Sequence, residues 1–182
     1  PYAGARLQCD LMFEKKRPYL ACIDVFSNYA LAQSVGMKKT GRNTRIAMEK
    51  ILNRRPKEFG AILSCSTDGG TEFSQLDRLL QEYGARHKVL KTWQKSAMSE
   101  NLIGKIRELY RKYKTKTGRS NFKEILPYLL GTINKRYNRA LGMSPLAALE
   151  HKPGRIFRKK YSTYISKLKA ILDPQIDSKY KV

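Results

Sequence analysis

The chain has 182 residues, enough for one compact domain and too few for two of ordinary size. Its 37 Lys and Arg residues outnumber 15 Asp and Glu, and the net charge of +22 favours a polyanionic partner, most commonly nucleic acid, over a ribosomal-type or membrane-surface role. No apolar run approaches the ~18–20 residues that a membrane-spanning helix needs, so we expect no membrane partner.

Three strand-like segments open the chain, at 7–13, 19–27 and 28–35, and charged residues at 14–18 form the first turn. The segments are rich in Ile, Val, Leu and Phe, as extended strands usually are. Consecutive strands joined by short turns predict an antiparallel meander.

Because the chain starts at Pro1 without an initiator Met, we expect it to be a piece of a longer protein.

The cysteines Cys9, Cys22 and Cys65 all fall in strand-like runs. An odd number of cysteines in strands indicates buried thiols and a reducing compartment. The only histidines are His87 and His151, so the residue types exclude a Cys/His zinc site.

The middle of the chain alternates helical and strand-like patterns, which is typical of an α/β sheet. We predict a helix capped by Asn43 or Thr44 and closed by Pro56, a buried strand at 60–66, a turn at 67–70, a helix at 74–83 stopped by Gly84, and a strand at 86–91.

The last part of the chain is predicted to be helical after a loop at 92–98. We expect a helix from Ser99 to near Gly118, a helix from Asn121 to about Asn138 kinked at Pro127, and a short helix from Ser144-Pro145.

This element order is that of an RNase H-like α/β fold, with a five-stranded mixed sheet whose first three strands are antiparallel. We assign residues 1–151 to that domain. Residues 152–182 are rich in Lys and Arg and are predicted to form a basic C-terminal linker or arm.

Three acids stand at informative places: Asp10 inside an apolar strand, Asp68 at the end of a central strand, and Glu100 in the first turn of a helix. Each has a simpler explanation, as an edge-strand acid facing solvent, a turn former, or a favourable charge at a helix N-terminus. In the predicted fold, however, the first and fourth strands are neighbours and the helix packs beside them. All three carboxylates would then meet at one end of the sheet.

Such a trio suits phosphodiester chemistry. Two Mg²⁺ ions about 3.5–4 Å apart can stabilise the attacking and leaving oxygens, and Mn²⁺ can substitute for Mg²⁺. We expect Asp10 to bridge both ions, with Asp68 on one and Glu100 on the other. A metal-bound water or a DNA 3′-hydroxyl would be the nucleophile.

Four stretches resemble the catalytic core of the retroviral integrase superfamily, most closely the integrases of Polinton/Maverick elements and virophages. They are Tyr19-Leu20 with residues 23–30, the Thr-Asp-Gly-Gly-Thr-Glu-Phe motif at 67–73, Ser99-Glu100-Asn101, and residues 137–139 with 142–146.

The resemblance implies a DDE integrase with Asp10, Asp68 and Glu100 as catalytic acids. It would process the 3′ ends of mobile-element DNA and transfer them into target DNA. Double-stranded DNA and further copies of the chain would be its partners, in the nucleus or viral factory of a eukaryotic host. The sequence departs from the family at Gly104, where relatives often carry a basic residue that touches DNA.

The predicted DNA contacts lie around Glu100. Trp93 and Lys95 precede it in the loop that inserts at the DNA end in relatives, although Trp93 could instead fasten the loop to the core. Lys105, Arg107 and Arg111 follow it on the helix, where a solvated basic face is the alternative.

Two other classes of function stay open: another RNase H-like nuclease, of the ribonuclease H or resolvase type, and a domesticated, inactive nucleic-acid-binding module. Glu49 on the first helix raises the ribonuclease H possibility, but its basic neighbours favour a solvated face. Asp24 is a further acid that we place near the site end of the second strand, where we favour a structural role at the hairpin.

Overall fold

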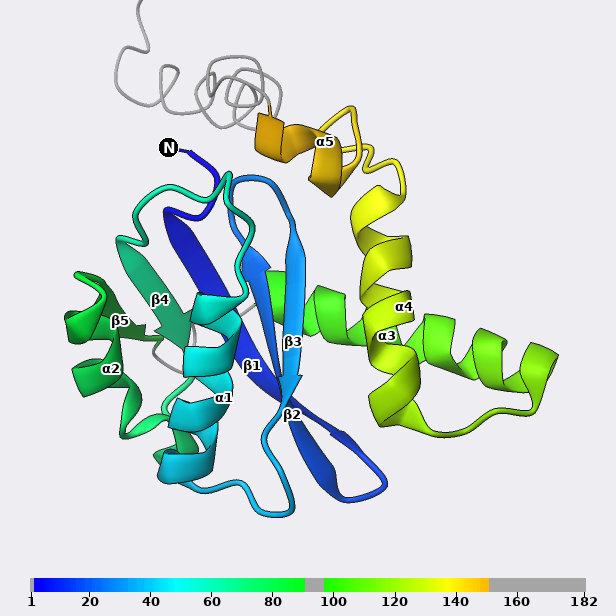
Figure 1. Ribbon diagram of the computed structural model, residues 1–182, viewed down its shortest axis with the longest axis horizontal. Helices are drawn as coiled ribbons and strands as arrows, with labels where there is room; N and C mark the ends of the chain where they lie inside the picture. Colours follow the sequence, from blue (N-terminus) through cyan, green and yellow to red (C-terminus); the bar gives the residue numbers. More distant parts are fainter. Residues whose placement is uncertain (1, 91–96, 151–182) are drawn as a thin grey trace, which may run out of the picture.

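A computed structural model describes residues 2–90 and 97–150 (Figure 1). Trp93, Lys95 and the predicted basic arm at 152–182 lie outside these residues, so the predictions about them stay untested. Within the described part, no helix combines the length and the apolar character that crossing a membrane requires.

The described residues form five strands, five α-helices and one 3₁₀ turn. The strands are β1 (Arg6–Glu14), β2 (Arg17–Asp24), β3 (Ala30–Ser34), β4 (Ser64–Thr67) and β5 (Arg86–Val89). The helices are α1 (Gly41–Asn53), η1 (Thr71–Phe73), α2 (Leu76–Glu82), α3 (Ala97–Thr117), α4 (Phe122–Lys135) and α5 (Pro145–Glu150).

The sheet has the strand order β3-β2-β1-β4-β5. Strands β1, β2 and β3 pair antiparallel, whereas β4 pairs parallel with both β1 and β5. The predicted mixed sheet with an antiparallel meander first is therefore confirmed. Its central strand is β1, which is hydrogen-bonded on both sides.

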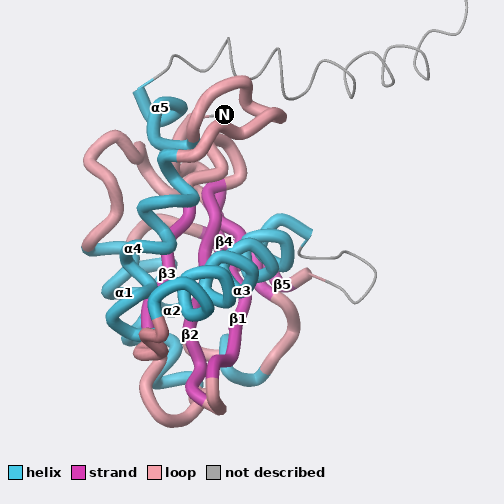
Figure 2. Tube along the Cα trace, turned by 90° about the vertical axis from the view of Figure 1, so that its right-hand side faces the viewer, coloured by secondary structure: helices cyan, strands magenta, loops and turns pink. Residues whose placement is uncertain are grey.

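Helices cover both faces of the sheet and create two cores (Figures 1 and 2). Side chains of α1 and α2 pack against Leu7 and Cys9 of β1 on one face. Side chains of α3 and α4 pack on the other face, where Met12 is the β1 contribution. Because side chains alternate along a strand, Gln8, Asp10 and Met12 point toward the α3 face.

Several element boundaries differ from the prediction. Helix α1 begins earlier, after Thr40, whose hydroxyl accepts a hydrogen bond from the Asn43 backbone N–H at 3.2 Å. Strand β4 begins only at Ser64, because the preceding segment hydrogen-bonds to the N-terminal residues, as in the bond from the Gly60 N–H to the Ala3 carbonyl. Helix α4 ends at Lys135, short of the predicted Asn138.

The helix stops and the last helix agree better with the sequence. Gly84 and Gly118 both adopt φ +69°, a conformation that glycine accepts readily after a helix. Pro145 opens α5, and the Ser144 hydroxyl accepts a hydrogen bond from the Ala147 N–H at 3.1 Å. Pro127 lies inside α4, which continues past it.

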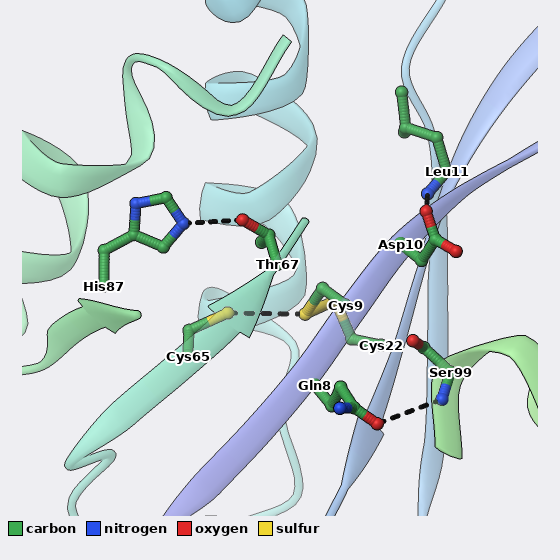
Figure 3. The surroundings of a disulfide bond; sticks show 9 residues. All are labelled: Gln8, Cys9, Asp10, Leu11, Cys22, Cys65, Thr67, His87 and Ser99. Carbon is green, nitrogen blue, oxygen red and sulfur yellow. Dashed lines mark hydrogen bonds between the residues drawn. A yellow bond between two sulfur atoms is a disulfide. The ribbon is translucent and has the colours of Figure 1, made fainter. Parts of the chain in front are cut away.

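The prediction of three thiols is wrong for two of the cysteines (Figure 3). Cys9 and Cys22 lie directly opposite each other on β1 and β2, with Cα atoms 4.1 Å apart, and form a disulfide. Cys65 on β4 is a free thiol, and burial raises its pKa to about 12. The burial of all three sulfurs is confirmed, and the compartment remains a prediction.

Candidate active site

Asp10 lies in the middle of the central strand, so the explanation of an acid on an edge strand is excluded. It is partly buried on the α3 face between Gln8 and Met12. Its Oδ1 accepts a hydrogen bond from the Leu11 backbone N–H at 2.7 Å (Figure 3). A partly buried carboxylate on an inner strand is costly unless it is paired or bound to a cation, which makes Asp10 a candidate for chemistry.

Asp68 follows β4 directly and reaches the same region as Asp10. The parallel register pairs Gln8 with Ser66, and two further residues along each strand bring Asp10 level with Asp68. Neighbouring strands lie about 4.8 Å apart. Asp68 is exposed, and its Oδ1 accepts a hydrogen bond from the Gly70 N–H at 3.2 Å, so it also shapes the turn.

Glu100 lies in the first turn of α3, as predicted, and is exposed. The helix begins two residues before the predicted cap, and Ser99 is buried inside its first turn. The acceptor for the helix start is Gln8, whose Oε1 accepts a hydrogen bond from the Met98 N–H at 3.0 Å. The same oxygen accepts a second hydrogen bond, from the Ser99 N–H at 3.3 Å (Figure 3).

Gln8 is a functional candidate that the sequence analysis missed. It lies two residues before Asp10 on the same face of β1, and it joins that strand to the residues just before Glu100. It therefore fixes the start of α3 relative to the sheet. Strand alternation could have placed Gln8 on the Asp10 face, but no local pattern predicts its partners.

The acids influence one another electrostatically. Burial raises the pKa of Asp10, and the negative charges of Asp68, Glu100 and Glu72 raise it further, while the Leu11 N–H opposes the shift. The three predicted acids thus act on one locality, although they are far apart along the chain. Mutual repulsion in a partly desolvated site is the condition that a bound cation relieves.

Glu72 is a second residue that the sequence analysis did not assign. It lies on η1, its side chain is only 12% exposed, and its Oε1 is 3.3 Å from the Lys39 ammonium. A Cβ added to Gly70 would lie 2.8 Å from the Glu72 carboxyl group and 3.2 Å from the Asp68 Oδ1. Gly70 therefore lets the two carboxylates approach each other, and the Thr-Glu-Phe part of the motif was the available signal.

The donor chemistry of these residues fits a hard cation. Carboxylate oxygens are the ligands that Mg²⁺ and Mn²⁺ prefer, and Mg²⁺ is often held by only one or two of them together with water and phosphate. No group of three or more His, Cys, Asp or Glu side chains in the described ranges is gathered closely enough to enclose a metal ion. Asp10 on β1 and Asp68 directly after the neighbouring strand β4 are the pair that we consider for sharing an ion.

The predicted basic contacts on α3 fall on two different flanks. Arg107 and Arg111 follow Glu100 by about two and three full helical turns, so all three share one flank. Lys105 follows it by five residues and points about 140° away. Trp93 and Lys95 belong to the stretch outside the described residues.

The remaining acids lie elsewhere. Asp24 pairs with Leu7, away from the Asp10 level of the sheet, so its predicted place near the site is wrong. Its role at the hairpin is confirmed, because its Oδ2 accepts hydrogen bonds from the Ser27 N–H at 2.7 Å and hydroxyl at 2.6 Å. Glu49 belongs to α1, which packs on the opposite face from Asp10.

A hydrogen-bonded chain supports the end of β4 beside Asp68. The Thr67 hydroxyl donates to the Asp68 carbonyl at 2.9 Å and lies 2.8 Å from Nε2 of His87 on β5. The other ring nitrogen of His87 is 3.1 Å from Asp77 on α2. These contacts tie β4, β5 and α2 together at the residue before the second acid.

Solved structures with the same arrangement decide the fold. The HTLV-2 integrase catalytic core domain, in complex with magnesium in a trimeric form, matches with a TM-score of 0.67 over 82% of this chain and 98% of that one, at 19% identity. The chain has the fold of a retroviral integrase catalytic core. The expectation of an RNase H-like domain is thereby confirmed.

A second integrase assembly gives the same result. A chain of the simian T-cell lymphotropic virus intasome, in complex with the PP2A regulatory subunit B56 gamma, matches with a TM-score of 0.72 at 16% identity. The match covers 83% of this chain and 56% of that one, so this chain corresponds to about half of the simian virus protein. No protein-family profile and no curated protein matches the sequence.

Proposed function

We propose that the chain is a DNA integrase core that cuts mobile-element DNA at its 3′ ends and joins these ends to target DNA. The observation that carries the proposal is the placement of Asp10. Its carboxyl group lies on the central strand of an integrase-type fold, and its pKa is raised first by burial and further by the charges of Asp68 and Glu100. Two acids from neighbouring strands and one from a helix start form the set that such chemistry needs.

The proposed roles follow from position. Asp10 and Asp68 would hold Mg²⁺ or Mn²⁺ with help from Glu100, and the bound ions would supply charge stabilisation for phosphoryl transfer. Gln8 keeps the start of α3, and therefore Glu100, at a fixed place beside β1. Arg107 and Arg111 lie on the Glu100 flank, where they would bind DNA phosphates and orient the strand to be cut.

The same proposal includes the partners and the setting. Double-stranded DNA, both element ends and target, is the substrate that the charge of +22 favours. Assembly of several copies is proposed because the HTLV-2 core domain is in a trimeric form and the simian virus structure is an intasome. Affiliation with Polinton or virophage elements, and action in a nucleus or viral factory, rest on the sequence motifs alone.

Incubation with end-labelled duplex DNA and Mg²⁺ or Mn²⁺ tests the proposal. We expect shortened 3′ ends and longer strand-transfer products from the unaltered chain. The control Glu58→Gln, an exposed acid in the segment that connects α1 to β4, should give the same products. Asp68→Asn should produce neither. Cleavage of RNA–DNA hybrids alone would instead indicate a ribonuclease, and tight DNA binding without metal-dependent products would indicate an inactive module.

A further inference from the structure

A pocket of about 580 Å³ opens on the flank of α3 that faces away from Glu100. It lies between α3, the C-terminal end of α4 and the connection from α4 to α5. Figure 2 shows α3 crossing in front of the sheet, with the α4-to-α5 connection above it. The pocket is thus separate from the carboxylates but belongs to the same helix.

The floor of the pocket is apolar. Ile23 and Leu102 are buried there, and Leu109 and Ile133 are partly buried. Pro145, at the start of α5, closes one side. An apolar hollow of this size can receive a flat ring and remove it from water.

The rim of the pocket is positively charged. Lys105, Arg136 and Arg139 are all exposed and line it from α3 and from the residues after α4. The acid among the lining residues, Glu108, is hydrogen-bonded to the Lys112 ammonium at 2.5 Å. Three cations and one acid among these lining residues leave the rim with an excess of positive charge, which attracts phosphate groups.

An exposed aromatic ring completes the rim on a hydrogen-bonded turn. Tyr137 is 64% exposed, and it lies between Arg136 and Asn138. Asn138 holds the turn, because its Oδ1 accepts a hydrogen bond from the Ala140 N–H at 3.0 Å and its own N–H donates to the Met143 carbonyl at 2.9 Å. The ring and its basic neighbours are thus presented by a fixed backbone.

We propose that this pocket binds single-stranded DNA, with phosphates at Lys105, Arg136 and Arg139 and a base against Tyr137 and the apolar floor. An aromatic ring between cations is the usual platform for single strands, because every base has a stacking face. A base within an intact duplex cannot enter a hollow without leaving its stack, so the shape favours an unpaired strand.

The proposal deepens the proposed function and rests on it in one respect. DNA joining would bring a DNA end to the start of α3, and the pocket on the opposite flank would then hold an unpaired strand near that end. Binding itself needs no catalysis, so it can be measured independently of the reaction.

Fluorescence anisotropy with a labelled single strand of about eight nucleotides tests the pocket. The variant Arg136→Glu/Arg139→Glu should weaken binding at least about tenfold. The slope of log affinity against log salt concentration should become shallower by about 1.4, since each single-strand phosphate contact contributes about 0.7 to it. The control Arg42→Glu/Lys57→Glu makes the same charge change at exposed residues outside the pocket and should weaken binding far less.

The aromatic part has its own pair of variants. Tyr137→Ala should lower single-strand affinity about tenfold, whereas Tyr137→Phe should retain it, because the ring and not the hydroxyl carries the contact. A blunt duplex of the same sequence should lose little affinity in Tyr137→Ala. Unfolding would not imitate this pattern, since both substitutions are at an exposed position.

Two results would overturn the proposal: equal losses in the pocket and control pairs, or unchanged single-strand affinity in Tyr137→Ala. If the unaltered chain gives no strand transfer while these binding differences persist, the proposed function fails and the pocket stands.

Discussion

Gln8 offers the sharpest perturbation of the site, because one side-chain oxygen joins the central strand to the helix that carries Glu100. We expect Gln8→Met, which keeps the length of the side chain but removes the acceptor, to loosen the start of α3. The N–H groups of Met98 and Ser99 would lose hydrogen bonds of 3.0 and 3.3 Å. Loss of a helix-capping acceptor costs about 0.5–2 kcal/mol.

For a chain of this size, a loss of 1 kcal/mol lowers the melting temperature by about 2–4 °C, which calorimetry or circular dichroism resolves. The rate of strand transfer should fall even at temperatures where the variant is fully folded, because a misplaced Glu100 weakens the site without unfolding the domain. Amide exchange at Met98 and Ser99 should accelerate.

Gln8→Glu is the matched control, since it restores a carbonyl-type acceptor at the same place and sets a negative charge at a helix N-terminus. It should recover the melting temperature and the slow amide exchange. A Gln8→Met variant that melts and reacts as the unaltered chain does would refute this role of Gln8. Equal losses of melting temperature in Gln8→Met and Gln8→Glu would refute it as well.

Three further predictions concern other parts of the molecule. Burial raises the pKa of Asp24, so the folded state holds this proton more tightly than the unfolded chain does. The free energy of unfolding should therefore fall as pH rises from the ordinary aspartate pKa through the raised value. Denaturant titrations should show that Asp24→Asn abolishes this part of the fall. Gly70→Ala should displace the carboxyl groups of Asp68 and Glu72 and reduce strand transfer at nearly constant melting temperature. Full activity in this variant would contradict the close approach of both carboxyl groups to Gly70. Alkylation after unfolding without reductant should modify Cys65 alone, as read by mass spectrometry, and three modified cysteines would disprove the Cys9–Cys22 disulfide.

The order of the elements and the positions of Asp68 and Glu100 at element ends could be predicted because both leave local marks. Apolar alternation and glycine stops define strands and helices within a few residues, and Asp68 stands in a motif that ends a buried strand. Glu100 follows a loop and opens an amphipathic helix. The convergence of these acids with Asp10 followed from the strand order alone, and the structure brings their charges to bear on Asp10.

The parts that were missed depend on contacts between distant residues. Gln8 and Ser99 are 91 positions apart, and nothing near either residue announces their hydrogen bond. The pairing of Cys9 with Cys22 follows from the hairpin register, which a one-residue slip would have abolished. The late start of β4 has the same origin, since the residues before it bond to the N-terminal segment instead of the sheet.

The central claim is that Asp10 and Asp68 share a divalent cation. Anomalous scattering from crystals soaked in Mn²⁺ would test it most directly. We predict a manganese peak about 2.1 Å from carboxylate oxygens of both residues, lost in crystals of Asp68→Asn. Saturating Mn²⁺ with no peak beside Asp10, or with peaks only at unrelated acids, would contradict the account.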